Sequence, residues 1–404
     1  MMVKFHSEEC LTGRVMNTPT EVLPRSVVPL RGFIPSLEGM RAFASVGIIV
    51  THVAFQTGAA SSPIMGRIWG RFDLTVAIFF ALSGFLLWRP HAAQARGQGQ
   101  AQPVMRYLWS RAVRILPAYW VVVTLVLLFL PNTGSSWRVW VANLSLTQVF
   151  VPLTLTEGMT QMWSLSVEVA FYLLLPLFGL LMIGLRGEAA RYRIPVLLVT
   201  AILTLSWAFV PVSTPEAIHH DNWLPGYFPW FAAGMVLAEY STRQETWMHR
   251  LAARRVVVAV IAVVAFALSA TSIAGPQGLV RPESWQFEVK IVLGAVLAFA
   301  LLAPLVLAGE HRKHTVLEHP VTLALGRWSY GIFIWHLVIL AMVFPVFGII
   351  PFSGHFVLVL AVTVALSIPV AAASYALVEE PVRRALRPRA RAVTAEHNSS
   401  LTGA

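Results

Sequence analysis

The segment Leu37-Glu38-Gly39-Met40-Arg41-Ala42-Phe43-Ala44-Ser45-Val46-Gly47-Ile48-Ile49-Val50-Thr51-His52 places two ionisable side chains in a long apolar stretch. On an α-helix, Arg41 and His52 would lie about 20° apart around the axis and roughly 16 Å apart along it. An ionisable side chain at that depth in a membrane is costly, so it normally faces a bundle interior or a water-filled cavity. The segment therefore predicts a polar track that runs half way through a membrane-embedded helix bundle.

The composition of the whole chain is typical of a membrane protein. Of its 404 residues, 57% are hydrophobic and only 12% are charged, whereas soluble domains average about 25% charged residues. Apolar stretches of about 18 residues or more recur along the chain, each long enough to cross a bilayer. We predict an all-α polytopic membrane protein with about ten transmembrane helices. The predicted spans lie near residues 37–57, 72–89, 112–131, 163–184, 194–212, 223–240, 256–274, 289–309, 327–350 and 356–378.

The distribution of basic residues predicts the orientation. Of 30 Lys and Arg residues, 24 fall in or beside the connections on one side and five on the other, with Arg41 left inside the first span. The positive-inside rule then places both termini in the cytoplasm, in a multi-pass protein of the cell inner membrane. The net charge of +11 is thus a topology signal, and the expected partner is the lipid bilayer rather than nucleic acid.

Three regions are expected along the chain: a flexible cytoplasmic arm over 1–33, a transmembrane domain over 34–386 and a flexible cytoplasmic tail over 387–404. The low-complexity stretch 94–100 is interpreted as a solvated connector. Cys10 is the only cysteine, so no intramolecular disulfide and no cysteine-based metal centre can form. We expect no metal and no permanently bound cofactor.

Polar side chains gather toward the outer side of the predicted bundle. His52 lies late in the first span, Asp73 begins the second, and Glu168 lies about five residues into the fourth. Alternating span directions give these three side chains similar depths. An imidazole near a carboxylate is suited to general acid–base catalysis. The simpler alternatives are a structural histidine bonded within the bundle and a helix-capping aspartate.

Basic side chains gather toward the inner side. Arg111 and Arg114 are i, i+3 neighbours at the start of the third span, so they lie side by side on one helix surface. Paired guanidinium groups suit phosphate recognition, although an ordinary positive-inside cluster would have the same pattern. His336, in the ninth span, is expected near the inner half, in either a structural or a substrate-lining role.

These motifs resemble the acyltransferase-3 family of integral-membrane O-acyltransferases, over about residues 34–384. Seven segments carry the resemblance in family order: 34–41, Arg41 with His52, 72–74 with 79–85, 111–114, 163–168, 328–330 with 335–336, and 378–384. Each segment is weak evidence alone, but their order on a chain with ten predicted spans makes the resemblance specific.

The resemblance implies transfer of an acyl group, commonly acetyl from acetyl-CoA as cosubstrate, to a hydroxyl of an extracytoplasmic or membrane-bound acceptor. Many members carry an appended SGNH-type domain. This chain resembles the stand-alone type, which implies that the transfer is completed either within the ten spans or by a separate periplasmic or membrane partner.

Family motif and topology together give each residue an expected role. Arg111 and Arg114 would bind the donor phosphates, with Arg41 lining the path inward. His52 would act as general base or as covalent acyl carrier, assisted by Glu168 or Asp73. The expected substrate-lining residues are Ser166, Tyr330 and His336.

The acceptor is expected to be a cell-envelope glycan or glycolipid, with acylation of a macrolide-like secondary metabolite as the alternative. A rival class is a transporter or flippase that uses the same polar residues as a relay. Such a protein would move its substrate without changing it chemically.

Overall fold

The fold is all helical, as the composition predicts. The computed structural model describes residues 32–131, 133, 136–277, 280–308 and 314–386, and no strand occurs among them. The two termini for which flexible segments are predicted, 1–31 and 387–404, lie outside the described residues. The longer helices are α1 (Pro35–Gln56), α3 (Thr75–Ala95), α4 (Val104–Phe129), α6 (Trp163–Leu181), α7 (Arg193–Thr204), α8 (Leu224–Ser241), α10 (Arg255–Ser269), α11 (Ser284–Val306), α12 (Pro320–Phe347) and α13 (Phe356–Ser374). The shorter ones are α2 (Met65–Gly70), α5 (Trp137–Leu144), α9 (Trp247–Ala253) and α14 (Glu380–Ala385).

Each of the ten predicted spans overlaps one of the ten longer helices, but fewer than ten of the described helices meet the requirements for a membrane span. By length and composition, eight described helical segments are able to cross a membrane. A ninth arises if α9 and α10, which meet at 83°, form one broken span. Helix α8 is not among these segments, although it fills the position of the predicted sixth span. Its many buried residues, Glu239 among them, make it an interior helix of the bundle.

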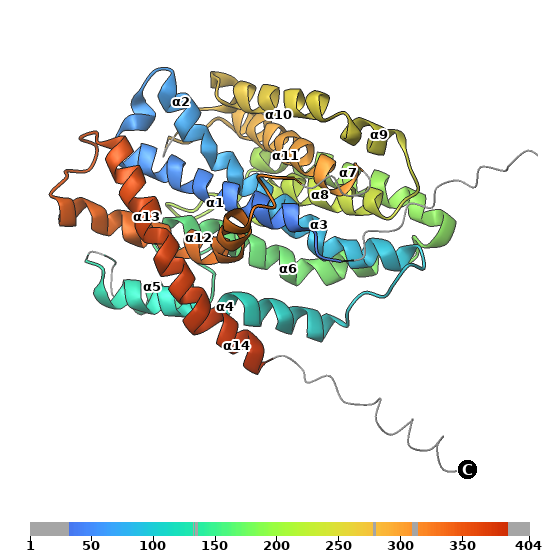
Figure 1. The fold of residues 1–404 in the computed structure, drawn as a ribbon, viewed down its shortest axis with the longest axis horizontal. Coiled ribbons are helices and arrows are strands. Elements are labelled where there is room, and N and C mark those ends of the chain that lie inside the picture. The colour runs from blue at the N-terminus through green and yellow to red at the C-terminus, as the bar shows by residue number, and fades with distance from the viewer. Residues whose placement is uncertain (1–31, 132, 134–135, 278–279, 309–313, 387–404) are drawn as a thin grey trace, which may run out of the picture.

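The centre of the bundle is built from α1, α3 and α8 (Figure 1). Helix α12 packs against α1, and α13 packs against both α12 and α1. Helix α11 packs against both α3 and α8, and α10 covers α11 at the opposite edge of the molecule (Figure 1). Segments far apart in sequence, above all α1 and α12, therefore lie side by side and bring their polar residues together.

Two glycines allow α3 and α8 to approach closely. A Cβ at Gly84 would overlap the carbonyl oxygen of Phe231, and a Cβ at Gly234 would overlap the carbonyl oxygen of Ala81. Small residues at facing positions are the usual means by which membrane helices pack backbone against backbone. The reciprocal pair fixes the register of α3 on α8.

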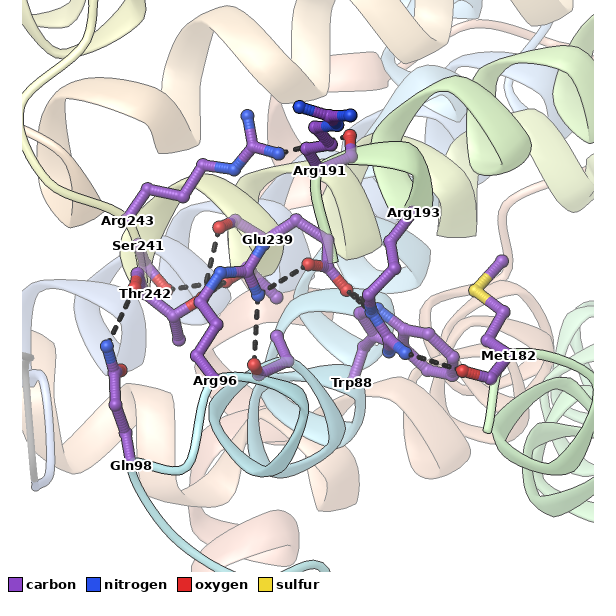
Figure 2. Close-up of polar contacts among 12 residues, drawn as sticks. Trp88, Arg96, Gln98, Met182, Arg191, Arg193, Glu239, Ser241, Thr242 and Arg243 are labelled. Carbon is purple, nitrogen blue, oxygen red and sulfur yellow. Dashed lines mark hydrogen bonds and ion pairs between the residues drawn. The ribbon is translucent and has the colours of Figure 1, made fainter. Parts of the chain in front are cut away.

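A buried ion-pair cluster ties together the ends of α3, α7 and α8 (Figure 2). Glu239, fully buried on α8, accepts hydrogen bonds from the Nε atoms of Arg193 at 2.7 Å and Trp88 at 2.8 Å. Arg96 NH1 lies 2.7 Å from the other carboxylate oxygen of Glu239. Gln98 Nε2 donates to the carbonyl oxygen of Thr242 at 3.0 Å. Arg96 and Gln98 therefore anchor the stretch 94–100 on the end of α8, whereas Gly97, Gly99 and Gln100 are exposed, as expected for a solvated connector.

Candidate active site

Two adjoining cavities lie in the middle of the bundle. The arginine cavity encloses about 780 Å³ of empty space including its open mouth, and the histidine cavity about 400 Å³ on the same basis. Both are lined by Val76, Ser164 and Phe333, which therefore form the boundary between them. The arginine cavity is otherwise lined by Arg41, Phe79, Phe80, Ser83, Leu86, Leu87, Arg111, Arg114, Ile115, Leu165, Glu168, Tyr172, Ser329 and Tyr330. The histidine cavity is otherwise lined by Ile48, His52, Asp73, Gln161, Trp163, Tyr227, Trp230 and Lys290.

Helix α1 contributes to both cavities, as the spacing of Arg41 and His52 predicts. Arg41 lines the arginine cavity and His52 lines the histidine cavity. The helix begins with Pro35 in its first turn, a position where the missing N–H costs no hydrogen bond. The predicted polar track is therefore present as two chambers along one face of α1.

The arginine cavity is strongly basic. Arg41 approaches Glu38 at 3.5 Å, one turn earlier on α1. Arg111 and Arg114, both on α4, form no salt bridge with any residue that the structure describes. Glu168 is the one acidic residue in the lining, against these three guanidinium groups. Such a cavity favours an anionic ligand with several oxygens, because guanidinium groups bind phosphate through paired hydrogen bonds.

His52 is hydrogen-bonded to a second histidine. Its Nδ1 lies 3.0 Å from Nε2 of His336 on α12, and the two rings are stacked with centroids 5.1 Å apart. Nδ1 of His336 lies 2.7 Å from the carbonyl oxygen of Phe333, so this nitrogen carries the proton and donates it. Nε2 of a neutral His336 is then an acceptor, and Nδ1 of His52 must be the donor to it. The arrangement leaves Nε2 of His52 with a free lone pair, which is the requirement for a general base.

The position of His336 differs from the prediction. This side chain is fully buried and lines neither cavity; it lies at the level of His52 rather than nearer the opposite end. The cause is the start of α12 at Pro320, seven residues before the predicted span, which moves His336 further along the bundle. Its contacts are those of a residue that orients His52.

Asp73 and His52 line the same cavity, in agreement with their predicted depths. However, the partner of Asp73 is Lys290 of α11, whose Nζ lies 2.6 Å from Oδ2. No hydrogen bond joins Asp73 to His52 among the described contacts. Asp73 therefore contributes to the wall of the histidine cavity and does not orient the imidazole.

Glu168 lies on the arginine cavity rather than beside His52. Its carboxylate accepts hydrogen bonds from Ser83 of α3 and from the Tyr172 hydroxyl, the latter at 2.6 Å. Glu168 follows Ser164 by more than one helical turn and so lies beyond the boundary of the two cavities, where it does not assist His52 directly. Glu168 instead offsets part of the positive charge around Arg111 and Arg114.

The expected substrate-lining residues have different positions. Tyr330 lines the arginine cavity, and its hydroxyl donates to the Ile115 carbonyl oxygen at 2.8 Å. Ser166 lines neither cavity, and its hydroxyl donates to the Met162 carbonyl oxygen of its own helix. Ser164, two residues earlier, faces both cavities, because residues two apart on a helix point in different directions.

Two polar residues of the histidine cavity, Lys290 and Gln161, are not among the predicted site residues. The position of Lys290 inside a predicted span is a signal in the sequence that could have indicated a role in the site. Gln161 lies just before the 163–168 motif and has no periodic or charge signature. Among the residues that the structure describes, no group of three His, Cys, Asp or Glu side chains could hold a metal ion.

A family model described as an acyltransferase domain matches residues 34–372. The chain belongs to the acyltransferase-3 family. The resemblance seen in its motifs is therefore confirmed. The two cavities lie entirely within the matched part of the chain.

Three relatives are similar to this chain over most of its length. The peptidoglycan O-acetyltransferase OatA of Listeria monocytogenes is 23% identical over 385 residues, which cover 88% of this chain and 56% of the relative. The putative peptidoglycan O-acetyltransferase YrhL of Bacillus subtilis is 26% identical over 87% of this chain and 55% of its own length. The chain thus spans little more than half of these two proteins. The acyltransferase MdmB of Streptomyces mycarofaciens is 29% identical over 76% of this chain and 79% of its own length. No solved structure matches the chain.

Proposed function

We propose that this protein transfers an acetyl group from acetyl-CoA to a hydroxyl of a cell-envelope glycan or glycolipid, in the inner membrane. The observation that carries the proposal is the pair of adjoining cavities, one lined by three guanidinium groups and the other by His52. An acyl transfer between an anionic donor and a hydroxyl acceptor needs these two environments next to each other.

The donor would occupy the arginine cavity. Arg111 and Arg114 would bind the phosphates of CoA, and Arg41 would line the path that the rest of the donor takes toward the histidine cavity. The apolar side chains Phe79 and Leu86 offer a wall for the pantetheine arm. The thioester would then reach the boundary at Ser164, along the face of α1 on which Arg41 and His52 lie roughly 16 Å apart in axial rise.

The acceptor hydroxyl would lie in the histidine cavity, within reach of His52. Nε2 of His52 takes the hydroxyl proton as the oxygen attacks the thioester carbonyl carbon, so a C–O bond forms and the C–S bond breaks. The thiolate of CoA then takes the proton from the imidazolium, and CoA and the ester are released. His336 holds the imidazole in the tautomer that this step needs.

The test is incubation of membranes that contain the protein with acetyl-CoA labelled in the acetyl group. We expect label in the envelope glycan or glycolipid fraction, and none with the His52→Ala variant at equal expression. Label in a soluble secondary metabolite would support the alternative acceptor, whereas substrate movement without label transfer would support a transporter.

The same assay separates the two roles open to His52. In one sample, the enzyme is incubated with labelled acetyl-CoA and the reaction is quenched before any acyl acceptor is added. The protein should be unlabelled in this sample if His52 acts as a base. Label on His52 that passes to the acceptor would make it a covalent carrier.

A further inference from the structure

The histidine cavity contains two buried acceptor atoms with no partner. Gln161 is 1% exposed, and its Nε2 donates to the Ile334 carbonyl oxygen at 3.3 Å, which fixes the orientation of the amide. Its Oε1 is buried and has no hydrogen-bond partner among the described residues. The same is true of Oδ1 of Asp73, whose other oxygen is bound to Lys290. Buried polar atoms without partners are rare and costly, so each of these oxygens should accept a hydrogen bond from a bound ligand.

These atoms restrict the chemistry of the ligand. Both are acceptors, so the group that satisfies them must carry O–H or N–H donors. A phosphate or a carboxylate would be repelled by the free oxygen of Asp73, and the ion pair with Lys290 leaves no unpaired positive charge to attract it. The histidine cavity thus favours a neutral ligand with several donors, in contrast to the basic arginine cavity.

Aromatic side chains form the rest of the wall. The Tyr227 hydroxyl donates to Asn222 at 3.0 Å and Trp230 Nε1 donates to Ile291 at 2.7 Å, so the polar atoms of both are occupied. Trp163 lies against Tyr227 with ring centroids 4.9 Å apart. What these residues offer a ligand is apolar ring surface.

We propose that the histidine cavity is a subsite for a sugar ring, in which Asp73 and Gln161 accept hydrogen bonds from two ring donors and Trp163 packs against the apolar face of the ring. The inference rests on the proposed function and narrows its acceptor to a ring that carries at least two donors besides the hydroxyl presented to His52. A glycan, a glycolipid headgroup and a glycosylated metabolite share this chemistry.

The first experiment maps the product. Membranes that contain the wild-type protein are given labelled acetyl-CoA, and the acetylated product is isolated and its ester position determined by mass spectrometry and NMR. We expect the ester on a sugar ring with two further O–H or N–H groups. An ester on an isolated alcohol, such as a lipid chain or glycerol, would overturn the inference while leaving the proposed acetyl transfer intact. Absence of any acetyl transfer from acetyl-CoA would overturn the proposed function itself. The fraction that contains the product separates an envelope source from a soluble metabolite.

The second experiment uses Gln161→Leu in the full-length protein. We expect a rise of at least tenfold in KM for the acyl acceptor and a fall in kcat/KM of about 10²-fold or more. The reason is that a site built to hydrogen-bond a substrate hydroxyl depends strongly on that hydrogen bond, which the leucine side chain cannot accept. KM for acetyl-CoA should change by less than about twofold. The matched control is Gln148→Leu, since Gln148 is also buried and also donates to a backbone carbonyl, that of Met162, but lines neither cavity. Equal acceptor KM in Gln161→Leu and wild type would contradict the role of Gln161, as would equal losses in the two variants.

Discussion

At the scale of single residues, the contact between His52 and His336 is the most specific feature of the site. The Phe333 carbonyl oxygen fixes the proton on His336, and His336 in turn fixes the proton on His52. A base oriented in this way loses less entropy on reaching the transition state than a freely rotating imidazole. Under the proposed function, His336 would be a positioning residue that acts through His52.

Replacement of His336 should lower kcat and leave both KM values nearly unchanged. We expect His336→Ala to reduce kcat by about 10²-fold, near the lower end of what a general base contributes. His336→Gln should retain more activity, because its side-chain oxygen can accept the hydrogen bond from His52. The double variant His52→Ala/His336→Ala should be no slower than His52→Ala alone. A purely structural His336 would instead lower the folded yield of all variants and show no rescue by Gln.

The arginine pair gives the opposite kinetic signature. Arg111→Ala and Arg114→Ala should each raise KM for acetyl-CoA by about tenfold, since a hydrogen bond to a charged group is worth about 1.5–3 kcal/mol. Lys replacements should restore only part of the affinity, because an ammonium group cannot reproduce the planar fork.

Steady-state kinetics over a range of acetyl-CoA concentrations checks this prediction. Arg106→Ala is the matched control, because Arg106 lies on the same helix but is exposed and outside both cavities. If all three variants had the same KM, the pair would be topology charges only.

The sequence predicted some of these residues and not others for a physical reason. Arg41 and His52 stand out because charge inside an apolar helix is costly wherever the helix packs. Gln161 and the contact between His52 and His336 depend on how α6 and α12 pack against α1, which no local pattern encodes. The sequence predicts the helix on which Glu168 lies but not the cavity that it lines, because a shift of one helical turn moves a side chain from one cavity to the other.

At the scale of helices, Glu239 holds three elements together at the end of the bundle that is drawn in Figure 2. Its carboxylate is the shared partner of Arg96 and Arg193, which lie on segments more than 90 residues apart. Removing the partner of a buried charge costs more than the ion pair contributes in isolation, because the remaining charges stay desolvated.

We therefore expect Glu239→Gln to destabilise the protein by about 3–5 kcal/mol. The measurement is thermal unfolding of the purified protein in detergent, where the variant should unfold at a clearly lower temperature. Glu245→Gln is the control, because Glu245 lies in the connection that follows α8 but is exposed and forms no described salt bridge. Equal unfolding temperatures for the two variants would show that the ion-pair cluster around Glu239 does not stabilise the fold.

At the scale of the whole molecule, the order of the cavities along α1 implies a direction for the reaction. The arginine cavity lies toward the start of α1, at Arg41, and the histidine cavity lies toward its end, at His52. The ten helices were predictable because apolar length and basic charge are local properties of the sequence. The division of the interior into two chambers was not, because it depends on side chains from several helices meeting at Val76, Ser164 and Phe333.

This arrangement predicts that donor and acceptor enter from opposite faces of the membrane. The positive-inside rule assigns the Arg106 end of α4 to the cytoplasm, so acetyl-CoA should reach the arginine cavity only from that face. In sealed vesicles of known orientation, we expect acetyl transfer when acetyl-CoA, which does not cross the bilayer, is supplied on the cytoplasmic face. Vesicles of the reverse orientation should become active only after they are permeabilised. Equal activity with the donor confined to the outer face would contradict both the orientation and the separate roles of the two cavities, because a donor that enters beside His52 would have no use for the three arginines at the other end.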